Sequence, residues 1–243
     1  FDMNSEGSGI SQEKTERVHD QGPSSAFSEF MKTGWAPTEF ADLEPLEVVT
    51  YAYSRRQVLS AAYVGKRLIL PAGALKVRAG DTDYNYRPDS AFAYYSGVQG
   101  ADSTADAVLV LEPSGDSHIT YLYMNPRSTR DTEAFYRDSR YGELWVGRRF
   151  TLAEAKARYQ IETRNLSELK DLLADGKKLL SLEDKDFATF TSEQRLCKDE
   201  YEVRELQRAV NATALGFNDV IRAIPAAVNT PRGERVLDSA FYG

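Results

Sequence analysis

The sequence predicts an α/β fold with a mixed β-sheet flanked by helices. Three observations indicate it: an apolar run continuous enough for a strand buried on both faces, a hairpin signal directly after it, and helical segments interleaved with further strand candidates. With 243 residues, 42% of them hydrophobic, the chain is long enough for one large domain or two small ones. We expect one α/β domain at residues 38–190, with other segments before and after it.

Residues 1–37 predict a mobile amino-terminal arm. Up to Ser25 they are mostly polar or small, and such a stretch buries too little apolar surface to offset the entropy of ordering it. A cluster of large apolar residues follows, namely Phe27, Phe30, Met31 and Trp35. We expect this cluster to anchor the arm on its own domain or on a neighbouring subunit.

The first element of the α/β domain is a predicted helix from Leu46 to Val64, with Arg55 and Arg56 on its polar side. Its inward side chains would be Leu59, Ala62 and Tyr63. Four strand candidates follow, namely Lys66–Leu70, Ala91–Gly97, Ala107–Leu111 and Ile119–Met124. The third is continuously apolar, so we place it in the centre of the sheet, and the turn after it makes the fourth its hairpin partner.

Two shorter helices are predicted where favoured cap residues precede helical patterns. Thr151 would cap one through Arg158, and Ser167 another through Ala174. Ile161 and the run Lys178–Leu182 supply the remaining strand candidates. Strands and helices therefore interleave across this part of the chain.

Residues 191–243 predict the incomplete beginning of a second domain. Apolar residues three and four apart draw one stripe along a long helix from Asp199 to Ile224, which Pro225 would end. Thr230 and Pro231 would then cap and start another helix. Its inward face would be Val236, Leu237, Ala240 and Phe241. Since no later residue could cover that face, we expect the domain to continue in a longer parent protein.

Composition excludes several classes of protein. No window approaches the roughly 18–20 continuous apolar residues of a membrane-spanning helix, and no secretory signal is visible at the amino end. A net charge of −7 disfavours binding to nucleic acid. The single cysteine, Cys197, excludes a disulfide framework and fits a reducing compartment. We therefore predict a cytoplasmic protein with neither nucleic-acid nor membrane partners.

No self-contained catalytic set is visible. His19 and His118 have no partners at metal-ligand spacing, and a nucleophile elbow and a phosphate-binding loop are both missing. The carboxylates at Asp81 and Asp83, and the acidic run from Glu183 to Asp186, read as solvated loops. We assign no catalytic residue and no metal ligand to this chain.

The most unusual stretch runs from Asp81 to Gly97, with the motif Asp-x-Asp-Tyr-x-Tyr-Arg-x-Asp-Ser-x-Phe-x-Tyr-x-x-Gly. From the residues alone it is an aromatic strand whose entry loop is held by an Arg87–Asp89 contact. Three later blocks occur with it in a fixed order, namely Ala107–Leu111, Gly142–Arg149 and Arg195–Ala209. Together they resemble aminopeptidase P, the Xaa-Pro aminopeptidases, over roughly residues 45 to 243. The insertion between Arg127 and Gly142 and the arm before Pro37 suggest an actinobacterial-type branch.

The resemblance implies the creatinase/aminopeptidase P type of amino-terminal domain, followed by the first helices of a truncated pita-bread α+β domain. Such enzymes remove the first residue from peptides with proline second, and form homo-dimers or homo-tetramers. They use two divalent metal ions, usually manganese, held on five ligands of the second domain. None of these ligands can be placed here, so we expect the metals to bind outside this segment and the segment alone to be inactive.

Three residues match substrate-facing positions of the family. Asp81 and Trp145 resemble positions that reach a neighbouring subunit's site, where Trp145 would form an apolar wall for proline. Arg195 resembles a junction arginine facing the peptide beyond the scissile bond. The alternative interpretations are structural: a loop cap for Asp81, a core position for Trp145 and an interdomain ion pair for Arg195.

Two other functional classes remain open under the same architecture. A prolidase shares the domain plan but cuts only dipeptides, and the tyrosine-rich motif and the Trp-x-Gly-Arg-Arg block favour aminopeptidase P over it. Catalytically inactive members bind proteins instead of peptides. An Asp, Asp, His, Glu, Glu series in the rest of the parent would indicate an enzyme, and its absence a binding module.

Overall fold

The computed structural model describes residues 22–36, 40, 42–80 and 82–243. They fall into two compact units, one drawn from Phe1–Glu39 and Arg127–Arg148, the other from Phe40–Pro126 and Arg149–Gly243. The prediction of a mobile arm rests mainly on residues that lie outside the described ones. No helix of the described part is long and apolar enough to cross a membrane.

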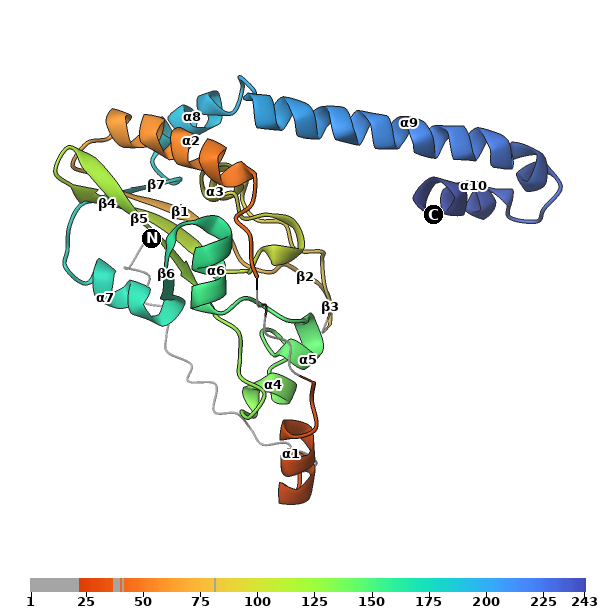
Figure 1. Ribbon diagram of the computed structural model, residues 1–243, viewed down its shortest axis with the longest axis horizontal. Helices are drawn as coiled ribbons and strands as arrows, with labels where there is room; N and C mark the ends of the chain where they lie inside the picture. Colours follow the sequence, from red (N-terminus) through yellow and green to blue (C-terminus); the bar gives the residue numbers. More distant parts are fainter. Residues whose placement is uncertain (1–21, 37–39, 41, 81) are drawn as a thin grey trace. The chain divides into compact units, whose positions relative to one another are not determined.

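The larger unit is built on a five-stranded mixed sheet in the order β6-β5-β4-β1-β7 (Figure 1). Its strands are β1 (Arg67–Pro71), β4 (Val108–Ser114), β5 (Ser117–Met124), β6 (Glu162–Asn165) and β7 (Leu179–Ser181). The central strand β4 is antiparallel to β1 and β5, whereas β7 and β6 add in parallel at the two edges. The mixed sheet, the central position of Ala107–Leu111 and the hairpin are therefore confirmed.

Successive side chains of the central strand β4 point to opposite faces of the sheet, and since residues Val108–Leu111 are all apolar, both faces need a covering layer. Leu109 and Leu111 of β4 point into one apolar core, and Val108 and Val110 point into a second. The first core is closed by α2 (Val48–Ala62), α3 (Ser90–Ser96), α6 (Leu152–Tyr159) and α8 (Lys185–Gln194). The second is closed by the 3-10 turn Leu166–Glu168 and α7 (Leu169–Leu173). Smaller elements are the β2 (Val77–Ala79) and β3 (Thr82–Asp83) hairpin and the 3-10 turn Gly100–Asp102.

The predicted strand Ala91–Gly97 is wrong, because these residues form α3. The Asp89 carboxylate accepts from the backbone N–H groups of Ala91 (2.7 Å) and Phe92 (3.4 Å), which caps the helix. Gly97 ends it at φ 77°, and an added Cβ there would lie 2.9 Å from Val48 Cγ1. The expected Arg87–Asp89 contact is also replaced, since Arg87 donates to the Ser90 hydroxyl at 3.3 Å.

The predicted polar side of α2 is wrong as well. Arg55 and Arg56 are buried and Ala62 is exposed, whereas Leu59 is buried as expected. Both arginines donate to carbonyls in the last turn of α3, Arg55 to Tyr94 and Arg56 to Tyr95. Cationic donors at a helix carboxyl end satisfy carbonyls that have no partner within the helix, so two charged residues face inward here.

Thr151 caps α6 through a capping box with Glu154, as predicted. Ser167 does not begin a helix. The side chain of Asn165 caps the 3-10 turn that leads into α7, and Ser167 lies inside that turn. Asn is as good a cap as Ser, and it stands at the point where β6 ends.

The helix predicted to stop at Pro225 continues past it, as α9 (Glu200–Val228). Proline removes one donor to the preceding turn, and one missing bond near the end of a 29-residue helix does not terminate it. Thr230 donates back to the carbonyl of Ala226 at 2.7 Å, so it closes α9 instead of capping the next helix. That helix, α10 (Gly233–Tyr242), starts after Arg232 in the left-handed conformation.

The predicted inward face of α10 is confirmed in part, because it packs against α9 without being fully buried. Its four apolar residues are half-buried, and Phe241 contacts Phe217 of α9 with ring centroids 5.3 Å apart. Gly216 permits this approach, since an added Cβ would lie 3.0 Å from the Phe241 ring. The stripe along α9 itself stays largely exposed, from Val203 (54% exposed) to Ile224 (44%).

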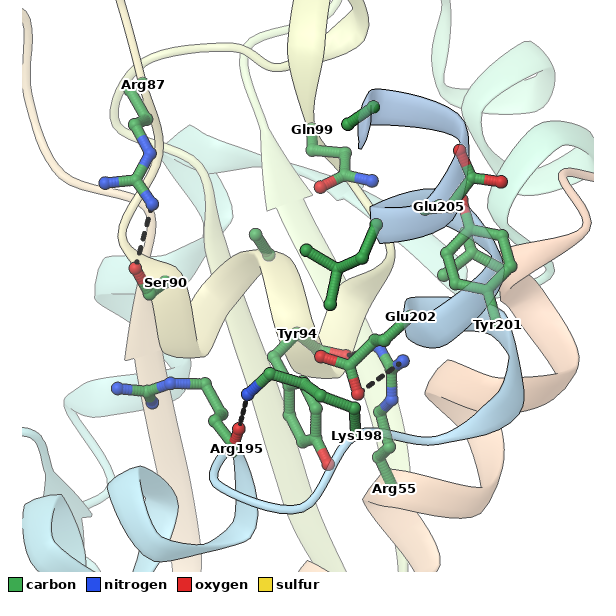
Figure 2. Close-up of a pocket in the computed structure, with 14 residues that line it drawn as sticks. Arg55, Arg87, Ser90, Tyr94, Gln99, Arg195, Lys198, Tyr201, Glu202 and Glu205 are labelled. Atoms are coloured by element: carbon green, nitrogen blue, oxygen red, sulfur yellow. Dashed lines mark hydrogen bonds and ion pairs between the residues drawn. The ribbon is translucent and has the colours of Figure 1, made fainter. Parts of the chain in front are cut away.

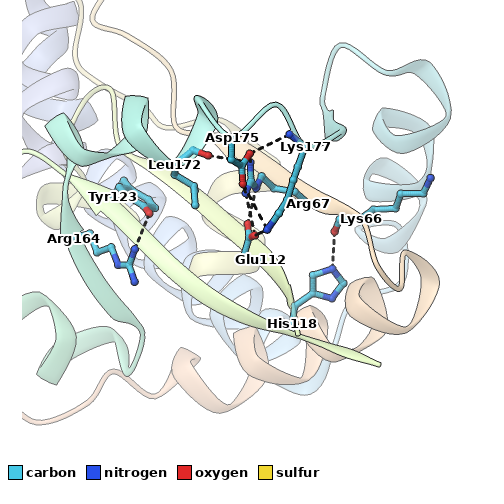
Figure 3. A network of polar contacts seen from close by, with 9 residues as sticks. All are labelled: Lys66, Arg67, Glu112, His118, Tyr123, Arg164, Leu172, Asp175 and Lys177. Atoms are coloured by element: carbon cyan, nitrogen blue, oxygen red, sulfur yellow. Dashed lines mark hydrogen bonds and ion pairs between the residues drawn. The ribbon is translucent and has the colours of Figure 1, made fainter. Parts of the chain in front are cut away.

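A buried ion cluster joins strands β1 and β4 to the loop before β7 (Figure 3). Arg67, only 1% exposed, pairs with Glu112 at 2.5 Å and with Asp175 at 2.7 Å, and Lys177 contacts Glu112 at 3.1 Å. The hydrogen bonds that the guanidinium donates to Asp175 and Glu112 lower the pKa of both carboxyls and raise the pKa of Arg67. The cluster therefore stays fully ionised at neutral pH.

The smaller unit combines two segments far apart in the sequence. Its helices are α1 (Ser25–Lys32), α4 (Ala134–Arg137) and α5 (Glu143–Val146). Phe27 packs edge-on against Tyr136 (6.0 Å between centroids), and Trp35 against Phe135 (5.1 Å). The apolar cluster after residue 25 is thus anchored on the insertion of the same chain.

Candidate functional site

A pocket of about 560 Å³ lies where the start of α9 meets α2 and α3 (Figure 2). Its polar lining includes Arg55, Arg87, Tyr94, Arg195, Lys198 and Glu202. All of these residues belong to the larger unit, and Arg195 is one of the three residues that the sequence assigns to a substrate site. The pocket therefore places one predicted substrate residue beside the junction of three helices.

Arg55 fixes the helix junction on which the pocket is built. Its Nε and Nη2 donate to the Asp199 carboxylate at 2.8 and 2.6 Å, and its guanidinium lies 4.2 Å from the centroid of the Tyr94 ring. Asp199 is also the N-cap of α9, in a capping box with Glu202. One buried arginine thus holds the start of α9 against α2 and α3, and its charge is neutralised by these carboxylates.

Three further cations around the pocket have only neutral partners among the described residues. Arg87 donates to the Ser90 hydroxyl, Arg195 to the carbonyl of Thr191 at 3.1 Å, and Lys198 to the carbonyl of Arg195. Glu205 also lines the pocket, but its carboxylate pairs with Arg208 at 2.5 Å. The three side chains line the same pocket, and each has N–H groups that can donate to an anion bound there.

Tyr94 contributes a neutral hydroxyl to the same region. Burial raises the pKa of Tyr94, an effect that the neighbouring Arg55 charge partly opposes. The hydroxyl donates to the carbonyl of Gln194 at 3.0 Å. This bond ties α3 to the end of α8, directly before Arg195, and so limits where the Arg195 backbone can lie.

Trp145 lies in α5 of the smaller unit and is 62% exposed. Its indole Nε1 donates to the carbonyl of Tyr136 at 2.6 Å, which fixes one edge of the ring and leaves the rest open. Its neighbours Leu144 and Val146 are also exposed. Such exposure does not support a core role for Trp145, and it leaves an apolar surface available for contact.

A buried carboxylate supports the exposed turn of α5. Burial by itself would raise the pKa of Glu143, but hydrogen bonds from Arg127 (2.5 Å) and Arg130 (2.8 Å) outweigh it and hold that pKa below its ordinary value. Gly142 precedes it, and an added Cβ there would lie 2.4 Å from the carbonyl oxygen of Asp138. Position 142 therefore has no room for a side chain, and position 143 requires a carboxylate to pair with the two arginines.

The three predicted site residues are placed as follows. Arg195 lines the pocket, and no ion pair with a carboxylate holds it within the described part of the chain. Trp145 belongs to the smaller unit, and Arg195 to the larger one. Asp81 lies outside the described residues.

Sequence reasoning missed Arg55, Arg87 and Lys198 as pocket residues. Arg55 stands three residues after Ala52 and four before Leu59, both fully buried, which is the spacing of an inward helix face. Arg87 and Lys198 stand inside the motif and the junction block that carried the resemblance. Arg87 and Lys198 could therefore have been found from the family blocks, whereas for Arg55 the helical spacing indicates an inward position but not its partner.

The described residues do not fit a metal centre. Nowhere in them do three or more His, Cys, Asp or Glu side chains group as a metal site would. Asp184, from the acidic run, caps α8 through the Phe187 N–H at 3.1 Å. His118 is held between the Ser60 hydroxyl and the carbonyl of Lys66, each at 2.7 Å.

Comparison with known proteins gives a family match over residues 51–181, to the model described as "Aminopeptidase P, N-terminal domain". The chain is 40% identical over 240 residues to Xaa-Pro aminopeptidase 1 of Streptomyces coelicolor, covering 91% of this chain and 48% of that protein. It is 36% identical over 238 residues to Xaa-Pro aminopeptidase 2 of the same organism, covering 90% and 49%. The chain thus spans about half the length of the curated relatives it matches.

Solved structures give the same fold. Aminopeptidase P from E. coli with the inhibitor Pro-Leu matches with a TM-score of 0.61 and 19% identity, covering 82% of this chain and 50% of that one. Proline aminopeptidase P II from Yersinia pestis matches with a TM-score of 0.58 and 19% identity, covering 80% and 50%. The predicted fold class, an α/β domain followed by part of a second domain, is confirmed by these matches.

Proposed function

Since this chain belongs to the aminopeptidase P amino-terminal domain family, we propose that it is the oligomerisation and substrate-gating part of a metal-dependent Xaa-Pro aminopeptidase. The observation that carries the proposal is the 40% identity to Xaa-Pro aminopeptidase 1 of S. coelicolor, which extends over 91% of the chain. That alignment includes the start of α9, well beyond the family match that ends at residue 181. The parent would remove the first residue from peptides with proline second.

The proposal assigns a task to each segment. Residues 1–37 form an arm, residues 38–190 the gating domain, and residues 191–243 the start of the catalytic domain. The ion pairs between Arg55 and the carboxylates Asp199 and Glu202 support a fixed junction between the last two. A homo-dimer or homo-tetramer in the cytoplasm is part of the same proposal.

Arg195 and its pocket would bind the part of the peptide beyond the scissile bond. A peptide ends in a carboxylate, and three cations without carboxylate partners in the described part of the pocket suit such a group. Trp145 would supply an apolar wall beside proline in a neighbouring subunit's site, since its ring is open on one side. Asp81 would reach the same neighbouring site.

Metal binding is proposed for the parent and not for these residues. The described part holds no suitable cluster of ligands, so two divalent ions, manganese by preference, would bind in the second half of the parent. There they would supply an activated water and polarise the scissile carbonyl. The present chain would contribute the shape of the entrance and the recognition of the peptide's far end.

The decisive experiment measures manganese-dependent release of the first residue from an Xaa-Pro-Xaa tripeptide by the full-length parent, with an Xaa-Pro dipeptide as the comparison. We expect turnover of the tripeptide and none by the 243-residue chain alone. Cleavage restricted to the dipeptide would indicate a prolidase. A metal-loaded parent that turns over neither substrate would overturn the enzyme proposal in favour of a protein-binding module.

Variants of the parent test the two gating residues. Arg195→Ala should raise KM about tenfold or more, since a charge-assisted hydrogen bond to the substrate is lost, whereas Arg222→Ala on the exposed side of α9 should not. Trp145→Ala should raise KM more than Leu144→Ala, a matched loss of apolar surface on the same turn. Equal effects within either pair would remove the corresponding residue from the gate.

A further inference from the structure

A second cavity, of about 610 Å³, lies in the larger unit between α2, α6 and the sheet. The residues that matter for its chemistry are Tyr53, Arg56, Ala157, Lys156, Ile161 and Glu162. Its size is that of a typical small-molecule site. Nothing in the proposed peptidase function makes use of it.

Arg56 is the unusual member of this lining. It is only 4% exposed, and its Nη1 donates to the carbonyl of Tyr95 at 2.7 Å. No carboxylate of the described chain lies in ion-pair contact with it. The carboxyl end of α3 offers it a partial negative charge at most, less than the unit charge that a buried guanidinium requires.

The other buried arginines show how this chain normally treats such a charge. Arg55, next to Arg56 in α2, is paired with Asp199 and Glu202. Arg67 is paired with Glu112 and Asp175. Among the three buried arginines of the described chain, Arg56 alone has no carboxylate partner, and it alone lines this cavity. A counter-ion is therefore missing at one defined place.

The remaining groups around the cavity leave one net positive charge. Lys156 and Glu162 neutralise each other at 2.6 Å. Both ring nitrogens of His118 are already engaged, Nε2 with the carbonyl of Lys66 and Nδ1 with the Ser60 hydroxyl. Burial lowers the pKa of Arg56 only to about 10, so the guanidinium remains charged at neutral pH. The cavity is thus matched to a single negative charge.

We propose that this cavity binds a small organic monocarboxylate, with the carboxylate on Arg56 and an apolar or aromatic body against Ile161 and Ala157. The Arg56 fork presents several N–H groups, one of which is occupied by Tyr95, and it suits the two oxygens of a carboxylate. Most of the lining is polar, and its apolar side chains, Ala153, Ala157 and Ile161, lie together at α6 and directly before β6, where a small hydrocarbon part of the ligand would pack.

The test uses the 243-residue chain with benzoate as the probe, in isothermal titration calorimetry and NMR chemical-shift mapping. We expect saturable binding of benzoate with shifts on α2, α6 and β5, at least about tenfold weaker binding of the neutral benzamide, and no competition by equimolar inorganic phosphate. Benzamide binding as tight as benzoate would overturn the role of charge. Phosphate that displaces benzoate would overturn the preference for a carboxylate.

Two variants locate the site. Arg56→Met should reduce benzoate affinity at least about tenfold, with folding checked by circular dichroism because the residue is buried. Ala153→Trp fills the cavity from an exposed position of α6, so it leaves the core intact and should abolish binding even if Arg56→Met does not fold. Val58→Trp, an exposed position of α2 outside the lining, is the matched control. Unchanged benzoate affinity in Ala153→Trp would overturn the proposal.

Discussion

The sheet of the larger unit and the α9–α10 hairpin use similar apolar side chains in opposite ways. In β4, Leu109 and Leu111 are completely buried. In α9, a helix of 29 residues, only Ala227 is buried, and Leu215 and Ile221 are 65% and 62% exposed. The β4 pattern repeats every two residues, and α9 carries apolar residues three and four apart that are exposed as well, such as Val203, Leu206 and Val210. Periodicity therefore identifies the face that an element can bury, and the presence of a partner decides whether it is buried.

Charges follow the same contrast. The arginine of β1 lies in a cluster with two carboxylates and is sealed from solvent, whereas the Arg222–Asp219 pair of α9 has side chains 74% and 53% exposed. A buried pair is costly to break because it leaves an uncompensated charge, and an exposed pair contributes little. The free energy of folding should therefore depend on the sheet, and hardly on α9.

The largest effect is expected for Arg67→Met. It removes the guanidinium from Glu112 and Asp175 and should lower the free energy of unfolding by about 4 kcal/mol. Arg222→Met, the matched change in α9, should alter it by less than about 0.5 kcal/mol. Urea unfolding followed by circular dichroism compares them, and similar midpoints would contradict the contrast between the two regions.

A pair of leucines sharpens the comparison without any charge. Leu109→Ala leaves a cavity in the middle of the sheet and should cost about 3 kcal/mol. Leu215→Ala removes the same atoms from an exposed position and should change stability by at most about 0.5 kcal/mol. Urea unfolding of the 243-residue chain measures both changes. If Leu215→Ala lowered the free energy of unfolding by about 2 kcal/mol or more, as truncation of a buried leucine does, α9 would have a partner in solution.

The smallest effect concerns pH. The Arg67 hydrogen bonds, opposed by burial, lower the pKa of Glu112 in the folded chain, so its stabilisation is complete above the ordinary pKa of a glutamate, roughly 4, and is lost as pH falls through the lowered value. Melting temperatures between roughly pH 6 and pH 3 should therefore fall more steeply for the unmodified chain than for Glu112→Gln. Parallel curves would show that Glu112 does not contribute.

The strands were predictable because their signal is local. The apolar run Ala107–Leu111 fits only a strand between two layers, and the structure places it there. The helix α3 was missed because the aromatic content of Ala91–Gly97 favours a strand, while its helical evidence rests on one cap residue and one glycine. The helix end predicted at Pro225 was wrong for a similar reason. The prediction gave one helix-breaking residue more weight than the helical pattern around it, and α9 continues to Val228.

The candidate site was predictable only where the family motif supplied it. Arg195 follows from the junction block and lines the pocket. Arg55 was assigned to the surface because its partner Asp199 stands 144 residues later, and no local pattern announces that pair. Arg56 was missed for the same reason, as its contact is with a helix that was read as a strand.

The smaller unit has a consequence for how the chain is made. The Tyr136 hydroxyl that contacts Ser28 of α1 belongs to a residue 108 positions later in the chain. At a synthesis rate of roughly 5–20 residues per second, α1 leaves the ribosome roughly 5–20 s before its partner exists. A helix of eight residues is not stable alone in water. During translation, the apolar side chains of Phe27 and Phe30 are therefore exposed to solvent, and a chaperone that binds apolar segments at the ribosome could bind them.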